Sequence, residues 1–207
     1  MRLLVLAKEP VPGLVKTRLT PPFRPHQAAA LAAAALADTL AAACAVPGVQ
    51  PLLVLDGRPG PWLPRGLAWV PQSAGALDDR LGAAFDGCAG EPALLVGMDT
   101  PQLTPRLLTE AVTATRQGAA LGLAADGGWW ALGLASPDGD LLRGIPTSVA
   151  DTGALQRRRL KDAGLRVADL PVLRDVDTAD DAWAVAADCP DTAFARLLAE
   201  LDRVGAA

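Results

Sequence analysis

Short apolar runs that alternate with helix-forming stretches constrain the fold of this chain more than any other feature. Leu3–Ala7, Pro51–Leu55 and Ala93–Met98 are continuously apolar, which is typical of strands buried on both faces of a sheet. The alanine-rich run His26–Ala45 and the stretch Leu77–Cys88 lie between them and favour helices. This alternation predicts an α/β protein with a mainly parallel sheet between helices.

The second half of the chain adds one antiparallel element to this pattern. Ala119–Ala125 and Trp129–Ala135 flank the turn Asp126-Gly127-Gly128, and Asp-Gly between two apolar runs predicts a hairpin. Leu165–Leu170 is a weaker strand candidate, and Thr178 with Asp181 predicts a capped helix. No repeat or linker interrupts the sequence, so we expect a single domain over residues 1–207.

The loop after the first predicted strand carries three cations, Lys8, Lys16 and Arg18, and one acid, Glu9. Two prolines and a glycine stiffen it, and it follows a buried strand, so it is a candidate cradle for nucleotide phosphates. Solvated loop charges are the alternative for any one of these cations. Lys16-Thr17 imitates a P-loop, but Val15 stands where that motif needs glycine, and Pro21-Pro22 blocks a following helix, which excludes it.

Carboxylates follow two of the predicted elements. Asp99 ends the run Ala93–Met98, and Asp175-Val176-Asp177 precedes the helix capped by Thr178. Because ligands of open α/β sheets bind at the carboxyl ends of the strands, these acids are candidates for holding Mg²⁺ or Mn²⁺. A turn role for Asp99 and a helix-dipole role for the other two are the alternatives. His26 is the only histidine, which excludes a zinc site built on histidines.

Other features exclude whole classes of function. A net charge of −4 gives no general attraction for nucleic acid, and no apolar run reaches the ~18 residues of a membrane span. The amino terminus lacks the pattern of a signal peptide, so a cytoplasmic protein is expected. The separated cysteines Cys44, Cys88 and Cys189 are expected to be core residues. Trp129 and Trp130 face opposite sides of a strand, so one belongs to the core and the other is free to line a pocket.

Four motifs in this order resemble those of an uncharacterised, glycosyltransferase A-like bacterial family, also called "transferase 1, rSAM/selenodomain-associated". They are AKEPVPGLVKTRL, GMDTPQLTP, DGGWWALGL and DVDTADD, and PQSAGALDDRLGAAF resembles a further segment of that family. The resemblance implies the three-layer fold of the nucleotide-diphospho-sugar transferase superfamily (GT-A type). Molybdenum-cofactor and phospholactate nucleotidylyltransferases share that fold.

The resemblance also implies roles for individual residues. Asp99 would be the principal metal ligand and Asp177 the second. Catalytic groups would be Lys16, Arg18 and Asp99. Base and phosphates of a nucleotide would contact Ala7, Lys8, Gly13, Lys16, Arg18, Gln72 and Arg80. The acceptor side would comprise Asp126, Gly127, Gly128 and Trp130.

The sequence departs from that family mainly on the acceptor side. Thr100 stands where the family usually has cysteine, and Trp129-Trp130 stand where it has tyrosines. We therefore expect an enzyme, a divalent-metal-dependent transferase with a nucleotide donor and an unknown small-molecule acceptor. Glycosyl transfer from a nucleotide sugar and nucleotidyl transfer from an NTP both remain open, because each breaks a bond at a pyrophosphate. A non-catalytic nucleotide-binding protein on the same fold is the alternative.

Overall fold

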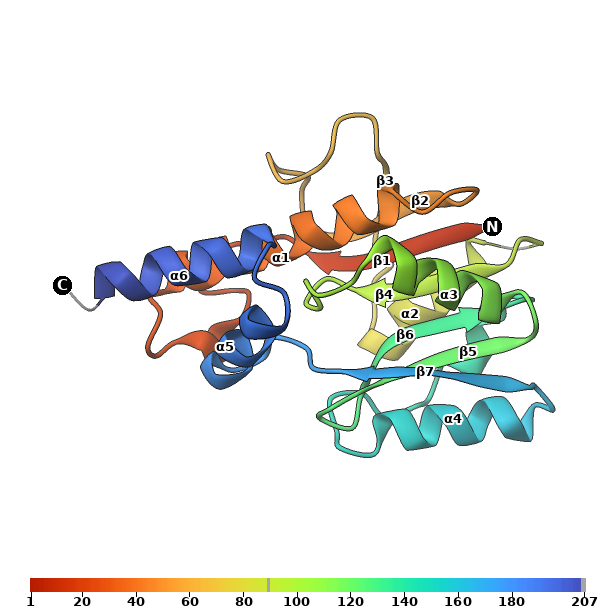
Figure 1. The fold of residues 1–207 in the computed structure, drawn as a ribbon. Helices are drawn as coiled ribbons and strands as arrows, with labels where there is room; N and C mark the ends of the chain where they lie inside the picture. The colour runs from red at the N-terminus through yellow and green to blue at the C-terminus, as the bar shows by residue number, and fades with distance from the viewer. Residues whose placement is uncertain (89, 206–207) are drawn as a thin grey trace.

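Seven strands form one twisted sheet with helices on both faces (Figure 1). The structure, a computed structural model, describes residues 1–88 and 90–205. In spatial order the strands are β3 (Ala68–Pro71), β2 (Gln50–Asp56), β1 (Arg2–Lys8), β4 (Ala93–Gly97), β6 (Trp129–Leu134), β5 (Ala119–Ala124) and β7 (Val167–Leu173). The helices are α1 (Pro25–Cys44), α2 (Leu77–Asp86), α3 (Pro105–Thr115), α4 (Thr152–Asp162), α5 (Ala179–Asp188) and α6 (Ala193–Gly205), with short 3₁₀ helices η1 (Thr17–Leu19) and η2 (Gly139–Leu141).

The predicted sheet, mostly parallel with one antiparallel element, is confirmed. Strand β6 runs antiparallel to both β4 and β5, and the other neighbouring strands pair in parallel. The hairpin of β5 and β6 turns at Asp126-Gly127-Gly128, as the Asp-Gly signal predicts. Strand β7 runs through Pro171, beyond the predicted end at Leu170, because an edge strand has a free side on which the missing proline N–H costs nothing.

Alternation along the strands divides the core into two layers. In β1, Leu3 and Val5 join α1 and α3 on one face, whereas Leu4 joins α2 and α4 on the other. Both layers are closely packed, since these three side chains have no exposed surface. This packing fixes the position of β1, and therefore of the loop that follows it.

A third cluster joins the carboxyl-terminal helices to the loop after β1. Phe194 of α6 and Val185 of α5 pack with Leu19 of that loop and with Leu31 on the outer side of α1. In Figure 1, α6 lies along α1, and α5 lies beneath them, away from the sheet. The loop that carries Lys16 is thus held between the sheet and a helical layer.

Cys44 at the end of α1 is exposed, so the prediction that it lies in the core was wrong. Cys88, after α2, is buried as predicted. Within the described residues, α1 has the length and composition of a membrane-crossing helix, but 56% of that window is buried inside the protein. Burial of this kind is typical of a core helix, and α1 packs on β1 and β2 accordingly.

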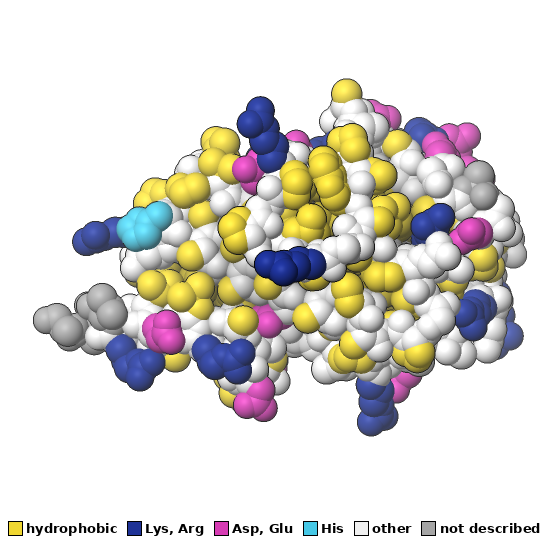
Figure 2. All heavy atoms as spheres, turned by 90° about the horizontal axis from the view of Figure 1, so that it is seen from above, with side chains coloured by type: hydrophobic (Ala, Val, Ile, Leu, Met, Phe, Trp, Pro, Cys, Tyr) yellow, Lys and Arg dark blue, Asp and Glu magenta, His cyan; other side chains and the backbone are white. Residues whose placement is uncertain are grey.

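Charged side chains are dispersed over the face seen from above. Figure 2 shows Lys and Arg side chains standing singly there, interspersed with Asp and Glu, around a central group of hydrophobic side chains. The described part of this face carries no continuous basic patch of the kind that tracks a nucleic-acid backbone.

Candidate functional site

The site begins where the strand order reverses. Strand β1 lies between β2 and β4 and is parallel to both, with Leu6 paired to Gly97 near the carboxyl ends. Connections leave these two neighbouring strands in opposite directions, and such a switch point opens a crevice for ligands. The loop after β1 and Asp99 after β4 meet at this edge, as their positions in the sequence predict.

Lys16 connects the two chain segments through ion pairs. Its Nζ lies 2.7 Å from Asp99 Oδ2 and 4.0 Å from Asp177 Oδ1, and 12% of its side chain is exposed. The backbone of Lys16 is left-handed, with φ 48°, where it begins η1. Burial by itself lowers the pKa of Lys16, but the charge and hydrogen bond of Asp99, together with Asp177 and Asp175, outweigh it and raise the pKa above its usual value.

Arg18 adds a second, more exposed ion pair. Its Nη1 lies 2.5 Å from Asp177 Oδ2, and 73% of the Arg18 side chain is exposed. The hydrogen bond and the charge of Asp177 raise the pKa of Arg18 further. Both predicted metal ligands are thus engaged by a cation from the loop after β1.

The segment after β7 brings Asp175 and Asp177 to Asp99. Val176 N–H donates to the Asp99 carbonyl at 2.9 Å and the Val176 side chain is buried, whereas its neighbours Asp175 and Asp177 line the larger cavity. Burial raises the pKa of Asp175 to about 6, with further contributions from the charges of Asp99 and Asp126. Asp175 was one of the candidate carboxylates in the sequence, but the family resemblance assigned a role only to its neighbour Asp177.

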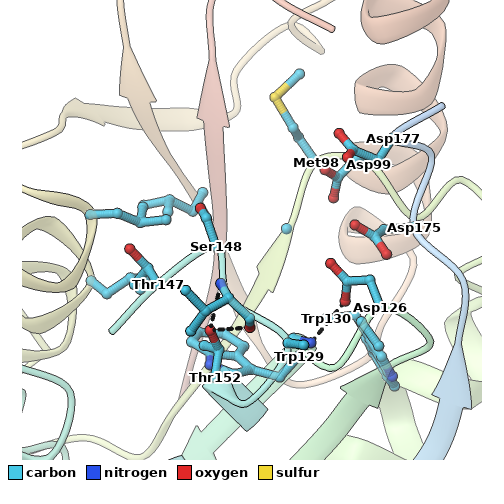
Figure 3. A pocket seen from close by; sticks show the side chains of 18 of the residues that line it. Met98, Asp99, Asp126, Trp129, Trp130, Thr147, Ser148, Thr152, Asp175 and Asp177 are labelled. Carbon is cyan, nitrogen blue, oxygen red and sulfur yellow. Dashed lines mark hydrogen bonds between the residues drawn. The ribbon is translucent and has the colours of Figure 1, made fainter. Parts of the chain in front are cut away.

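Two cavities meet at these ion pairs. The larger, of about 410 Å³, extends from Leu77 and Leu81 to Asp126 and Asp175. The smaller, of about 280 Å³, is lined by Lys8, Lys16 and other residues of the loop after β1. Both cavities are bordered by Arg18, Met98, Asp99 and Asp177. Figure 3 shows the carboxylates of Asp99, Asp126, Asp175 and Asp177 along one side of the larger cavity.

The opposite wall consists of a loop that the sequence did not single out as part of the site. Thr147 and Ser148 line the larger cavity across from the carboxylates (Figure 3). Thr152 Oγ1 lies 3.0 Å from the Pro146 carbonyl and 2.8 Å from the Val149 carbonyl, which fixes this loop at the start of α4. Polar residues just before a helix start were the only sequence signal for it.

Gly127 lets this loop approach the hairpin turn. Gly127 has φ +90°, and a Cβ there would lie 1.9 Å from the Ala150 carbonyl oxygen. Gly153 N–H donates to the Gly127 carbonyl at 2.8 Å. Asp126 Oδ1 in turn accepts from Gly128 N–H at 2.8 Å, so the predicted acceptor-side turn is a rigid corner of the cavity.

The two tryptophans differ in how much of their surface is exposed. Trp130 is 2% exposed, its Nε1–H donates to the Pro171 carbonyl at 2.9 Å, and its ring covers Gly122. Trp129 also lines the larger cavity and keeps part of its surface exposed. Both tryptophans thus line the larger cavity, the predicted Trp130 as an almost fully buried ring and Trp129 with part of its surface exposed.

Four of the residues predicted to bind nucleotide lie apart from both cavities. Gln72 Nε2 donates to the Ala7 carbonyl at 2.7 Å, and Arg80 Nη1 bonds Gln72 Oε1 at 3.1 Å and Asp56 Oδ2 at 3.2 Å. These bonds tie the ends of β1, β2 and β3 together. Gly13 lies on the exposed surface of the loop, with φ +78°. The cavities therefore unite Lys8, Lys16, Arg18, Asp99, Asp126, Gly128, Trp130 and Asp177, but not Ala7, Gly13, Gln72, Arg80 or Gly127.

The donor atoms around Lys16 fit a hard divalent cation. One ammonium already lies within 4.0 Å of oxygens from both Asp99 and Asp177, so the two carboxylates can share a cation. In residues 1–88 and 90–205 no group of three or more His, Cys, Asp or Glu side chains is arranged to hold a metal. Two carboxylates suit Mg²⁺, which usually takes its remaining ligands from water and substrate phosphates. The residues present therefore fit the predicted metal.

Comparisons with known proteins support the family and the superfamily that the sequence motifs resemble. Residues 28–149 match the family described as "Uncharacterized protein conserved in bacteria (DUF2064)". The chain belongs to this DUF2064 family. No curated protein sequence matches it.

Solved structures support the suspected superfamily. A Desulfovibrio desulfuricans G20 protein with the provisional name nucleotide-diphospho-sugar transferase is 25% identical, with a TM-score of 0.88 over 99% of this chain and 96% of that one. CMP:2-keto-3-deoxy-manno-octonic acid synthetase in complex with CTP is 15% identical, with a TM-score of 0.54 over 90% and 97%. Rv0371c of Mycobacterium tuberculosis H37Rv in complex with manganese is 18% identical, with a TM-score of 0.52 over 89% and 97%. The predicted fold class is confirmed, and the last two show the fold alone.

Proposed function

We propose that this protein is a divalent-metal-dependent transferase that takes its donor group from a nucleotide. The observation that carries the proposal is the ion-pair cluster of Lys16, Arg18, Asp99 and Asp177 at the carboxyl ends of β1 and β4, between two cavities. Cations and carboxylates at one crevice suit a metal-bound phosphate ester. The neighbouring structures reported with CTP and with manganese support a nucleotide and a divalent ion as ligands.

In this proposal Asp99 and Asp177 hold Mg²⁺ or Mn²⁺, which supplies charge neutralisation at the donor phosphates. Lys16 and Arg18 bind phosphate oxygens and stabilise the negative charge that accumulates when the bond at the pyrophosphate breaks. The nucleotide contacts the loop after β1, and its base borders the segment Gln72–Arg80, of which Leu77 lines the larger cavity. The acceptor enters beside Asp126, Gly127, Gly128 and the tryptophan pair. The whole chain acts as one domain, and we place it in the cytoplasm.

Glycosyl transfer and nucleotidyl transfer differ in their leaving groups. With water as a slow substitute acceptor, a nucleotide sugar would yield free sugar and a nucleoside diphosphate. An NTP would yield a nucleoside monophosphate and pyrophosphate. Chromatography of the products after long incubation with each donor therefore distinguishes the two reactions.

The test of the proposal is a thermal-shift panel of NTPs and nucleotide sugars with Mg²⁺, with Mn²⁺ and with EDTA. We expect one class of nucleotide to stabilise the protein only with metal, by about 2.7 kcal/mol when its concentration is 100 times Kd. Asp99→Asn should abolish this stabilisation, whereas Asp188→Asn, an exposed carboxylate at the end of α5, should preserve it. Stabilisation that persists in EDTA would support the non-catalytic nucleotide-binding alternative, and its absence with every nucleotide would refute the proposal.

A further inference from the structure

The four carboxylates of the larger cavity differ in their partners. Asp99 bonds Lys16 at 2.7 Å, and Asp177 bonds Arg18 at 2.5 Å. Within the described chain, Asp126 and Asp175 form no ion pair within 4.0 Å. Asp126 accepts only the Gly128 N–H at 2.8 Å, and Asp175 lies close enough to both Asp99 and Asp126 to be affected by their charges. Neither carboxylate is therefore neutralised by an ion pair, although the charge of Lys16 is close enough to lower the pKa of Asp175.

Apart from the four carboxylates and Arg18, the described residues that line the larger cavity are uncharged. Thr147 and Ser148 present hydroxyl-bearing side chains across from Asp126 and Asp175, and Trp129 contributes an apolar ring. Leu77, Leu81 and Leu95 line the cavity farther along. Arg18 is the one cation among the described lining residues, and it is paired with Asp177 at the border with the smaller cavity.

Cations are gathered around the smaller cavity instead. Lys8, Lys16 and Arg18 all line it, and all come from β1 or the loop after it. Positive and negative charges are thus separated across the Asp99–Asp177 border. An anionic ligand group is favoured on the loop side of this border and opposed on the Asp126 side.

We infer that the acceptor is a hydroxyl- or amino-bearing compound without negative charge, bound between Asp126 and Asp175 on one wall and Thr147 and Ser148 on the other. This inference rests on the proposed function, because it names the second substrate of the same site. Carboxylates accept charge-assisted hydrogen bonds from hydroxyl and ammonium groups, and the opposite wall offers hydroxyls that both donate and accept. A phosphate ester placed there would face the two carboxylates and be excluded, so the site discriminates by repulsion as well as by attraction.

Matched probes test this inference directly. The probes are glycerol with glycerol 3-phosphate, and glucose or glucosamine with glucose 6-phosphate, each titrated into the full chain with Mg²⁺. The readouts are the NMR signals of the Gly128 amide, which is bonded to Asp126, and of the Trp129 indole N–H, assigned through Trp129→Phe. We expect the alcohols and the amine to shift these signals, and the phosphate esters to bind at least tenfold more weakly.

Charge variants identify the cause of the discrimination. Asp126→Asn keeps an oxygen that can accept from Gly128 N–H but removes the charge, and Asp126→Lys reverses the charge. Asp126→Asn should reduce the ratio by which the alcohols bind more tightly than the phosphate esters, and Asp126→Lys should invert that ratio. Asp188→Lys should leave it unchanged. Phosphate esters that bind as tightly as their alcohols, or probes of which none reaches Gly128, would overturn the inference.

Failure of the acceptor inference and failure of the proposed function give different results. Nucleotide binding with metal together with phosphate-ester binding at Gly128 would refute the acceptor class and leave the proposed function standing. Binding of alcohols at Gly128 with no nucleotide binding at all would refute the proposed function and leave only the charge preference of the cavity.

Discussion

Asp99 and Asp177 form one pair of carboxylates in the larger cavity, and Asp126 and Asp175 form another. The first pair is engaged by Lys16 and Arg18, whereas the second has no cation within 4.0 Å among the described residues. All four are the same chemical group in the same cavity. The difference arises from the loop after β1, whose cations form ion pairs with the first pair and none within 4.0 Å with the second. Under the proposed function, these neighbouring cations separate the carboxylates that would hold a metal-bound phosphate from those that would face an uncharged acceptor.

The largest expected change in ligand affinity comes from Lys16→Met. This substitution removes the cation that bonds the first pair but keeps an apolar side chain of similar length. Nucleotide affinity should fall by about 1–3 kcal/mol, as for a lost charged hydrogen bond. Affinity for Mn²⁺ alone should rise, because the ammonium no longer competes for Asp99 and Asp177. Calorimetric titration with nucleotide and with Mn²⁺ measures both changes.

The fold should survive this substitution. A circular dichroism melt of Lys16→Met that shows an unfolded protein would mean that Lys16 has a structural role and that the nucleotide site is misplaced. Unchanged Mn²⁺ affinity in a folded variant would contradict the view that one cation position serves both carboxylates.

The next largest effect is a pH dependence of stability that arises from Asp175 in the second pair. Because burial raises the pKa of Asp175 to about 6, well above the ~3.9 of an exposed aspartate, the folded protein binds an extra proton between these pH values. Stability should therefore be lost as the pH rises from about 4 to above 6 in the absence of metal. Asp175→Asn should remove this loss and stabilise the protein at pH 7.5 by about 1 kcal/mol, a value reduced for the partial exposure of the carboxyl group.

Urea unfolding of Asp175→Asn and of the unmodified protein at pH 4.5 and 7.5, both in EDTA, measures this difference. The advantage of the variant should be confined to the higher pH. An equal advantage at both pH values would show that Asp175 titrates normally, and that the second pair is not set apart by its burial and neighbouring charges.

The first pair was more predictable from the sequence than the second. Unbroken apolar runs identify β1 and β4 as buried strands, and strands of a parallel sheet present their carboxyl ends at one edge. That reasoning places the loop with Lys16 near Asp99 without knowledge of the tertiary structure. It could not place Thr147 and Ser148, because the path of an irregular loop depends on close contacts such as that of Gly127 with Ala150.

The contacts between side chains from distant parts of the chain could likewise not be predicted from the sequence. Alternation shows that Trp129 and Trp130 face opposite sides, but only the sheet order decides that Trp130 covers Gly122 and bonds Pro171 on β7. The cluster of Phe194, Val185 and Leu19 joins segments far apart in the chain, and no local sequence pattern predicts it. Local periodicity thus predicted the elements, and long-range packing determined which side chains complete the site.

Arg18→Gln should have the smallest effect on stability and on nucleotide affinity. It compares the exposed Arg18–Asp177 ion pair with the less exposed Lys16–Asp99 ion pair. Both Lys16 and Arg18 bond a predicted metal ligand, but 73% of the Arg18 side chain is exposed against 12% for Lys16. Exposed ion pairs contribute little to stability, because solvent screens them and ordering long side chains costs entropy. The melting temperature of Arg18→Gln should therefore match that of the unmodified protein, and nucleotide affinity should fall less than in Lys16→Met. A larger loss of affinity than in Lys16→Met would instead make Arg18 the principal phosphate ligand and move the donor phosphates toward the exposed mouth of the smaller cavity.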